Sequence, residues 1–243
     1  MGQANAFIRS EMLLGAEAMR TLAASHVIVF GIGGVGGAAA EALARVGVGA
    51  IDLVDHDAVS ETNLNRQLAA LHSTIGKSKA RVMADRIADI NPDCQVTAHE
   101  TLYLPATKAE FDLSSYDYVI DAVDTVTAKL LIISEAQAAH TPVISSMGTA
   151  NKLDPTQLEV ANISDTSICP LARIMRKESR KRGFENYKVV YSREEPLVPT
   201  PLDDDPERPA ARRSTPGSVS FVPPVAGFIL AGEVVRDLVG ITR

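Results

Sequence analysis

Four glycines lie between a run of apolar residues and an alanine-rich segment, at Gly31, Gly33, Gly34 and Gly36. Residues 26–31 have the pattern of a buried strand, and residues 38–47 have the pattern of a helix that ends at a glycine. Glycines at such a junction permit a tight turn, and the amino end of the helix offers free N–H groups to a phosphate. The pattern therefore predicts a nucleotide-binding turn without saying which nucleotide is bound.

An acidic residue ends the next strand pattern, residues 50–57, at the place where a ribose is expected. Asp55 follows the last glycine of the turn at the spacing of a dinucleotide-binding fingerprint. A carboxylate at a strand end can accept hydrogen bonds from ribose hydroxyls. Because NAD-dependent dehydrogenases share this fingerprint, the turn and Asp55 alone leave an NAD-dependent oxidoreductase open.

The polar residues that follow favour ATP over NAD. They are Asp57, Asn63, Arg66, Gln67 and, near the start of a helix pattern at residues 78–90, Lys79. An arginine fork matches phosphate oxygens, and a lysine can neutralise charge that develops on a phosphate. Alone, Arg66 fits a solvated surface and Lys79 an ordinary helix lysine, so the order of the whole set carries the prediction of a triphosphate site.

Two further acids, Asp121 and Asp124, follow the fourth strand pattern. Ligands bind at the carboxyl ends of strands in such sheets, and carboxylates there can hold Mg²⁺ next to a triphosphate. Asp124 is favoured as the metal-linked acid, because the charge on a leaving pyrophosphate has to be neutralised. For Asp121 a role as a helix or turn cap is the alternative.

The elements that position these residues alternate between strand and helix. Further strand patterns occupy residues 95–100, 118–121 and 142–147, and a further helix pattern occupies residues 128–139. Strands separated by helices predict an α/β fold, a Rossmann-like, doubly wound, mostly parallel sheet with helices on both faces.

The length of 243 residues predicts one domain over residues 1–243. We expect an N-terminal helical segment (1–25), a nucleotide-binding core (26–150) and a C-terminal strand and helix elaboration (151–243). Within the elaboration the patterns predict strands at 157–164 and 187–192, a basic helix at 171–182, and a mobile loop at 194–217 that contains six prolines. Residues 219–240 are interpreted as a strand followed by a buried helix, too short an apolar span for a bilayer.

Composition excludes several classes of protein. The chain has 24 basic and 30 acidic residues, a net charge of −6, so it lacks the overall polycation signature of a non-specific nucleic-acid binder. Its two cysteines are too few for a disulfide framework or a four-cysteine zinc site, which favours the reducing cytoplasm. We expect no membrane partner.

As an ordered set, the motifs GIGGVG, VDHD, NLNRQ and DAVDT, together with Lys79, resemble the ubiquitin-activating-type adenylation family (ThiF/MoeB/HesA-like). The resemblance implies an enzyme that uses ATP and Mg²⁺ to adenylate a carboxylate. The resemblance implies that Asp55 binds the ribose, Lys79 binds the triphosphate and Asp124 binds the metal. It further implies that the phosphates are contacted by Asn63, Arg66 and Gln67. It also implies a homodimer in which Arg9 reaches the triphosphate of the partner subunit.

Two features point to one branch of this family. The paired Cys-x-x-Cys motifs of the sulfur-carrier-activating branch are absent from the sequence, and residues 166–183 and 217–235 resemble the branch that dehydrates threonylcarbamoyladenosine in tRNA. That branch closes its substrate into a ring beside the anticodon, an intramolecular step that needs no catalytic cysteine. Activation of a ubiquitin-like carrier, an NAD-dependent oxidoreductase and a nucleotide-sensing module without turnover are the alternatives.

A basic segment provides a candidate tRNA surface despite the negative net charge. Its members are Arg173, Arg176, Lys177, Arg180, Lys181 and Arg182. Such a cluster can contact RNA phosphates, although a solvated helix face explains it equally well. We interpret Cys169 as a small apolar residue at the start of this helix. Sulfur-trafficking proteins are further candidate partners, and a monovalent cation is a further candidate cofactor without assignable ligands.

Overall fold

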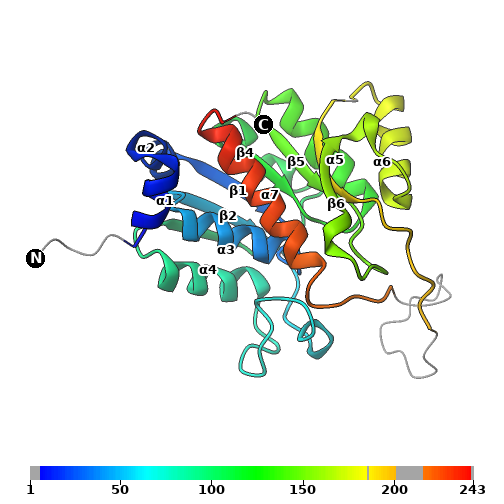
Figure 1. Ribbon diagram of the computed structural model, residues 1–243, viewed down its shortest axis with the longest axis horizontal. Coiled ribbons are helices and arrows are strands. Elements are labelled where there is room, and N and C mark those ends of the chain that lie inside the picture. The colour runs from blue at the N-terminus through cyan, green and yellow to red at the C-terminus, as the bar shows by residue number, and fades with distance from the viewer. Residues whose placement is uncertain (1–5, 185, 201–215, 242–243) are drawn as a thin grey trace, which may run out of the picture.

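The protein is described by a computed structural model that covers residues 6–184, 186–200 and 216–241. Its centre is a seven-stranded sheet in the order β3-β2-β1-β4-β5-β7-β6 (Figure 1). The neighbours from β3 to β7 pair in parallel, and β6 runs antiparallel to β7. The strands are β1 (His26–Phe30), β2 (Ala50–Val54), β3 (Gln95–His99), β4 (Tyr118–Asp121), β5 (Val143–Ser146), β6 (Leu158–Asn162) and β7 (Lys188–Ser192). The predicted fold class is confirmed.

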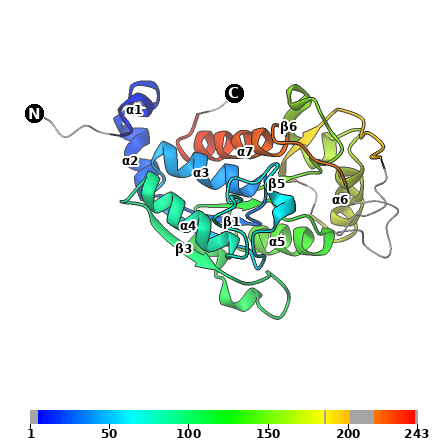
Figure 2. The same ribbon diagram turned by 90° about the horizontal axis from the view of Figure 1, so that it is seen from below.

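Helices cover both faces of the sheet, as Figure 2 shows for α3 and α7 against α5. Side chains alternate along β1, so Val27 and Val29 pack under α3, α4 and α7, whereas Ile28 and Phe30 pack under α5 and α6. The helices are α1 (Ile8–Leu14), α2 (Ala16–Ala24), α3 (Gly36–Val46), α4 (Lys79–Ile90), α5 (Val126–Ala138), α6 (Pro170–Lys181) and α7 (Pro223–Leu238). Two apolar cores, one on each face, therefore fix the sheet.

The chain reverses its direction across the sheet between β1 and β4. From β1 it runs outward through α3, β2 and α4 to β3, and then returns to place β4 on the other side of β1. The carboxyl ends of β1 and β4 thus become neighbours, and Phe30 pairs with Asp121 in register. Ligands bind at such switch points in open α/β sheets. The topology brings the predicted glycine turn and the predicted acids to one place.

The prediction for residues 219–240 is half right. The helix is present as α7, but residues 219–222 form no strand. Pro223 and Pro224, which lack N–H groups, start the helix at once, and the preceding segment crosses toward the nucleotide side, where Asn65 Nδ2 donates to the Ser218 carbonyl at 3.0 Å. Of the predicted mobile loop, residues 194–200 and 216–217 lack regular secondary structure, and residues 201–215 lie outside the described residues. The segment boundaries at residues 25 and 150 stay predictions.

No helix in the described ranges combines the length and the apolar character that crossing a membrane requires.

A buried acid on β2 connects β1, β3 and the residue Tyr116 before β4 on the α5 side. Asp52 is 6% exposed and accepts hydrogen bonds from His26 Nε2 at 2.9 Å, His99 Nε2 at 2.8 Å and the Tyr116 hydroxyl at 2.9 Å. Burial raises the pKa of Asp52, but the hydrogen bonds from the two histidines and the tyrosine outweigh burial and hold this pKa below its usual range. The ionised carboxylate therefore stabilises the fold.

We expect Asp52→Asn to lower the free energy of unfolding at neutral pH by about 1–3 kcal/mol, because three partly buried donors lose their charged acceptor. The lowered folded pKa means that this advantage is complete above the unfolded-state pKa of about 3.9. It is lost as the pH falls through the folded pKa. Urea denaturation of both proteins between about pH 7 and about pH 3 measures the difference. A difference that stays constant across this range would contradict the assignment.

Candidate nucleotide site

The glycine turn is too tight for larger residues at two positions. Gly31 has a φ of +86°, and a Cβ there would lie 2.8 Å from the Ala122 backbone. A Cβ on Gly36 would lie 1.8 Å from the Gly31 carbonyl oxygen. Within the described residues, the N–H groups of Gly33 and Gly34 donate no hydrogen bond. Unpaired amides just before a helix are available to phosphate oxygens.

Asp55 braces this turn from the end of β2. Its Oδ2 accepts a hydrogen bond from the Ile32 amide at 2.6 Å, and its Oδ1 accepts one from the Asp57 amide at 2.8 Å. The side chain is 9% exposed. Each carboxylate oxygen retains a further lone pair, so Asp55 can hold the turn in place and still accept from a ribose hydroxyl. Its contact with ribose stays a prediction.

Lys79 opens α4 and faces the segment that follows β2. Its Nζ lies 2.8 Å from Asp57 Oδ2. The lysine side chain is 8% exposed and that of Asp57 is 48% exposed, so the ammonium is enclosed and its partner faces solvent. Such an ammonium can exchange an exposed carboxylate for a phosphate oxygen, which binds it with similar charge-assisted hydrogen bonds. The structure thus pairs Asp57 with Lys79, and contact of either side chain with a nucleotide stays a prediction.

Asn63 and Arg66 lie on the short helix η1 (Glu61–Asn63) and the turn after it. Asn63 is buried, and its Oδ1 accepts from the Ser60 amide at 3.1 Å, so its side chain caps this turn. Arg66 Nη1 donates to the Thr62 carbonyl and to Asn65 Oδ1, both at 2.8 Å. A Cβ on Gly34 would lie 3.2 Å from the Arg66 carbonyl oxygen, which places this arginine against the glycine turn.

Gln67 provides the test of whether a nucleotide fits. Its Oε1 is buried without a hydrogen-bond partner within the described residues, and its Nε2 lies 3.9 Å from the position of a Cβ on Gly33. An unpaired buried acceptor costs about 1–3 kcal/mol. The Gln67 side chain approaches Gly33, so its unsatisfied carbonyl and the unpaired amides of the turn offer an acceptor and donors to a polar ligand.

The two acids after β4 have different environments. Asp121 is fully buried: its Oδ2 accepts from Lys129 Nζ at 2.9 Å and Ser145 Oγ at 2.5 Å, and its Oδ1 accepts from the Val123 amide at 3.2 Å. This arrangement differs from the expectation that Asp121 faces a ligand, because α5 delivers a lysine to it. Asp124 is exposed in the turn before α5 and is free to meet a metal ion.

Lys129 is the residue that sequence reasoning missed. It is fully buried, and its Nζ also donates to the Ser146 carbonyl at 2.6 Å, so Asp121, Ser145 and Ser146 use its three donors. A lysine flanked by apolar residues within a helix pattern, followed by Leu130, Leu131, Ile132 and Ile133, is the signal that could have revealed it. The pair joins β4, β5 and α5 beneath the site.

Arg9 lies far from the glycine turn of its own chain. Phe7, two residues earlier, approaches Gly47 at the carboxyl end of α3, within 3.6 Å of the Cβ position there. The turn lies at the other end of this helix, and eleven residues span about 16 Å. Figure 1 shows α1 and α2 together at one end of the molecule. A role for Arg9 in phosphate binding therefore requires a second chain.

The basic residues of α6 differ in their partners. Arg176 Nη1 donates to the Thr166 carbonyl at 2.6 Å and is partly buried. Glu178 pairs with both Lys181, at 2.9 Å, and Arg182, at 2.7 Å. The remaining members, Arg173, Lys177 and Arg180, are exposed. The helix thus presents a basic face, but part of its charge is already neutralised.

Comparison with known proteins assigns the chain to a family. The model of the ThiF family matches residues 7–243. This chain is a member of the ThiF family. Among its ThiF-family relatives, the tRNA threonylcarbamoyladenosine dehydratase of Bacillus subtilis (strain 168) is 46% identical over 238 residues, which are 96% of this chain and 94% of the relative. The enzyme of the same name from Escherichia coli (strain K12) is 44% identical over 165 residues, 68% of this chain and 62% of the relative.

The crystal structure of E. coli TcdA in complex with ATP superposes on this ThiF-family chain with a TM-score of 0.86. It shares 34% sequence identity, and the match covers 96% of this chain and 93% of that one. The predicted resemblance to the adenylation family is confirmed, including its extension over the C-terminal elaboration. That relative is therefore a protein that binds ATP.

Proposed function

We propose that this protein is an ATP-dependent tRNA threonylcarbamoyladenosine dehydratase. The observation that carries the proposal is the near full-length similarity to the B. subtilis enzyme of that name. The site supports it, because the unpaired amides of Gly33 and Gly34 and the unpaired carbonyl of Gln67 fit a nucleotide.

The reaction has two steps. First, a carboxylate oxygen of the threonyl group attacks the α-phosphorus of ATP, and pyrophosphate leaves with the electron pair of the broken P–O bond. Next, a nitrogen of the same substrate's carbamoyl linkage attacks the acyl carbon and loses its proton, and AMP leaves with the former carboxylate oxygen. Ring closure within one bound molecule gains from proximity, so no enzyme nucleophile is needed.

The residues of the site divide this work. The amides of the glycine turn and Gln67 bind and orient the nucleotide, and Asp55 accepts from its ribose. Arg66 and Lys79 stabilise the charge that develops on the phosphates, with Lys79 released from Asp57. Asp124 would hold Mg²⁺, which neutralises charge on the departing pyrophosphate. We leave Asp121 out of the nucleotide contacts, because its carboxylate is enclosed.

The proposal includes a homodimer. Helix α1 has no buried residue, and Met12 and Leu13 on it are 80% and 85% exposed. Apolar side chains gathered on one helix favour contact with another chain, and two-fold dimers are the commonest oligomers. If a partner subunit packs on α1, Arg9 lies close to the nucleotide site of that partner and away from the site of its own chain.

The RNA contact and the cellular setting complete the proposal. The exposed basic side chains of α6 would contact tRNA phosphates; they are Arg173, Lys177 and Arg180. A cytoplasmic location, sulfur-trafficking partners and a monovalent cation stay predictions.

The decisive experiment compares substrates. The protein is incubated with ATP and either tRNA that carries threonylcarbamoyladenosine or a carrier protein that ends in Gly-Gly. We expect AMP and pyrophosphate only with the tRNA, and a modified nucleoside lighter by one water in mass spectrometry. Adenylation of the carrier alone would support the carrier-activating alternative. Stabilisation by NADH but not ATP would support an oxidoreductase, and absence of pyrophosphate with every substrate would indicate a nucleotide-sensing module.

Replacing Cys169 with alanine is expected to leave AMP formation unchanged. The thiol is 2% exposed and packs in the core between the sheet and α6, and ring closure needs no thioester. Cys94→Ala, which removes the other buried thiol, is the matched control. Loss of activity on replacing Cys169, with activity kept on replacing Cys94, would instead indicate a thioester intermediate.

A further inference from the structure

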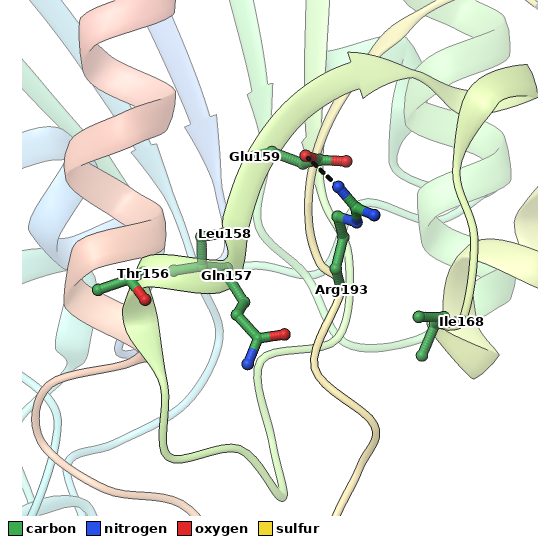
Figure 3. A pocket seen from close by; sticks show the side chains of 6 residues that line it. All are labelled: Thr156, Gln157, Leu158, Glu159, Ile168 and Arg193. Carbon is green, nitrogen blue, oxygen red and sulfur yellow. Dashed lines mark ion pairs between the residues drawn. The ribbon is translucent and has the colours of Figure 1, made fainter.

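A cleft of about 320 Å³ lies at the β6 edge of the sheet, away from the glycine turn (Figure 3). Its volume is at the lower end of the range for small-ligand sites. Leu158 at the start of β6 pairs with Ser192 at the end of β7. The cleft therefore lies at the carboxyl ends of the parallel strands, which is the end of the sheet that also holds the nucleotide site. Three strand spacings, about 14 Å, separate it from β4. The cleft is lined by Thr156, Gln157, Leu158, Glu159, Ile168 and Arg193.

One wall presents a fixed hydrogen-bond acceptor. Asp154 Oδ1 accepts from the Thr156 amide at 2.9 Å, and Asp154 Oδ2 accepts from Gln157 Nε2 at 3.0 Å. A carboxylate only accepts, so it holds the amino group of the glutamine and turns Gln157 Oε1 the other way. Figure 3 shows this oxygen on the side of Arg193.

The centre of the cleft holds an exposed guanidinium with one long ion pair. The Arg193 side chain is 62% exposed, and its Nη1 lies 3.8 Å from Glu159 Oε2, beyond hydrogen-bond distance (Figure 3). Within the described residues its guanidinium donates no hydrogen bond. Glu159 is held elsewhere, because its Oε1 accepts from the Tyr191 hydroxyl. The planar guanidinium points toward Glu159, and its hydrogen-bond donors remain available to a ligand in the cleft (Figure 3).

The far rim holds an apolar side chain in a costly backbone conformation. Ile168 is 50% exposed and has a φ of +59°. A β-branched residue rarely adopts this left-handed conformation, and strain of this kind concentrates where a ligand is bound. The adjacent hydrogen bond from the Cys169 amide to the Ser167 carbonyl, at 2.5 Å, holds the segment just before α6.

We propose that this cleft binds an unpaired base of the RNA substrate, adjacent to the modified adenosine. This rests on the proposed function. The base stacks between Ile168 and the Arg193 guanidinium, and its N–H edge donates to Gln157 Oε1. Single-stranded RNA is read in this way, with bases splayed out, stacked and hydrogen-bonded along their edges. Since α6 begins at Pro170, two residues after Ile168, its exposed Arg173 is placed to contact the phosphates of the same strand.

The test is a double-mutant cycle between protein and RNA. Stem-loop RNAs that carry the modified adenosine, intact or with one loop base removed, are titrated against wild type and Arg193→Ala by fluorescence anisotropy at fixed salt. Arg81→Ala is the matched control: its side chain is 69% exposed and pairs with Glu100, beside β3 at the opposite edge of the sheet. Gln157→Leu and Ile168→Gly test the other two walls.

For wild type, removal of one loop base is expected to weaken binding about 5- to 100-fold. Arg193→Ala should weaken binding of the intact RNA to a similar degree. Removal of that same base should then cause no further loss of affinity in Arg193→Ala, whereas Arg81→Ala should behave as wild type. Equal effects of every base on both proteins would overturn the proposal. AMP formation by wild type with modified tRNA is measured in parallel. Normal AMP formation without the coupling rejects the cleft alone, and absence of AMP formation rejects the function itself.

Discussion

Arg66→Ala is expected to lower AMP formation by about 10²–10³-fold or more while leaving the chain folded. The backbone carbonyl and Cγ of this arginine lie against Gly34 of the glycine turn, where we expect negative charge to develop on the phosphates as pyrophosphate leaves. Within the described residues its guanidinium donates to the exposed Thr62 carbonyl and the exposed Asn65 side chain, so its removal leaves no buried group unpaired. Product is measured as AMP by chromatography, and folding by thermal unfolding without nucleotide.

Two further variants sharpen this result. Arg66→Lys keeps the charge but loses the planar fork, so it should restore only part of the rate. Arg81→Ala removes a more exposed arginine, which pairs with Glu100, and should match wild type. Turnover at the wild-type rate in Arg66→Ala would remove this residue from the mechanism, and an equal loss in Arg81→Ala would indicate a general effect of surface charge.

The elements around the nucleotide site could be predicted because their patterns are local. The short apolar run of residues 26–30 predicts a strand buried on both faces, which is β1. The glycines that follow predict a tight turn into the helix α3. The same reasoning found β6, α6 and β7. It did not give their order across the sheet, because the antiparallel edge depends on the pairing of Val160 with Val190, which no local pattern encodes.

Pairings within the site were hidden for the same reason. Spacing placed Lys79 and Asp57 near the phosphates but could not show that they bind each other. The sequence favoured Asp124 for the metal and left Asp121 open between a ligand contact and a cap, and only the structure shows that Asp121 is buried whereas Asp124 is exposed. Nothing in the sequence predicted a role for Gln157. Its orientation depends on a hydrogen bond to Asp154, and its neighbours in the cleft come together only because β6 pairs with β7.

The buried pair beneath the site makes the strongest prediction for stability. Lys129→Met is expected to lower the free energy of unfolding by about 3–5 kcal/mol, because it leaves the carboxylate of Asp121 charged in a site without solvent. Methionine matches the lysine stem in shape, so packing is largely preserved. Chemical denaturation of wild type and variant measures the loss.

A matched surface pair and a second substitution show whether a stranded charge or lost packing destabilises Lys129→Met. Lys108 lies 2.7 Å from Glu135, with both side chains more than a third exposed, so Lys108→Met should cost about 1 kcal/mol or less. Adding Asp121→Asn to Lys129→Met removes the stranded charge and should recover much of the stability. If the double variant is as unstable as the single one, the lysine acts through packing, whereas recovery shows that α5 is tied to β4 and β5 by charge.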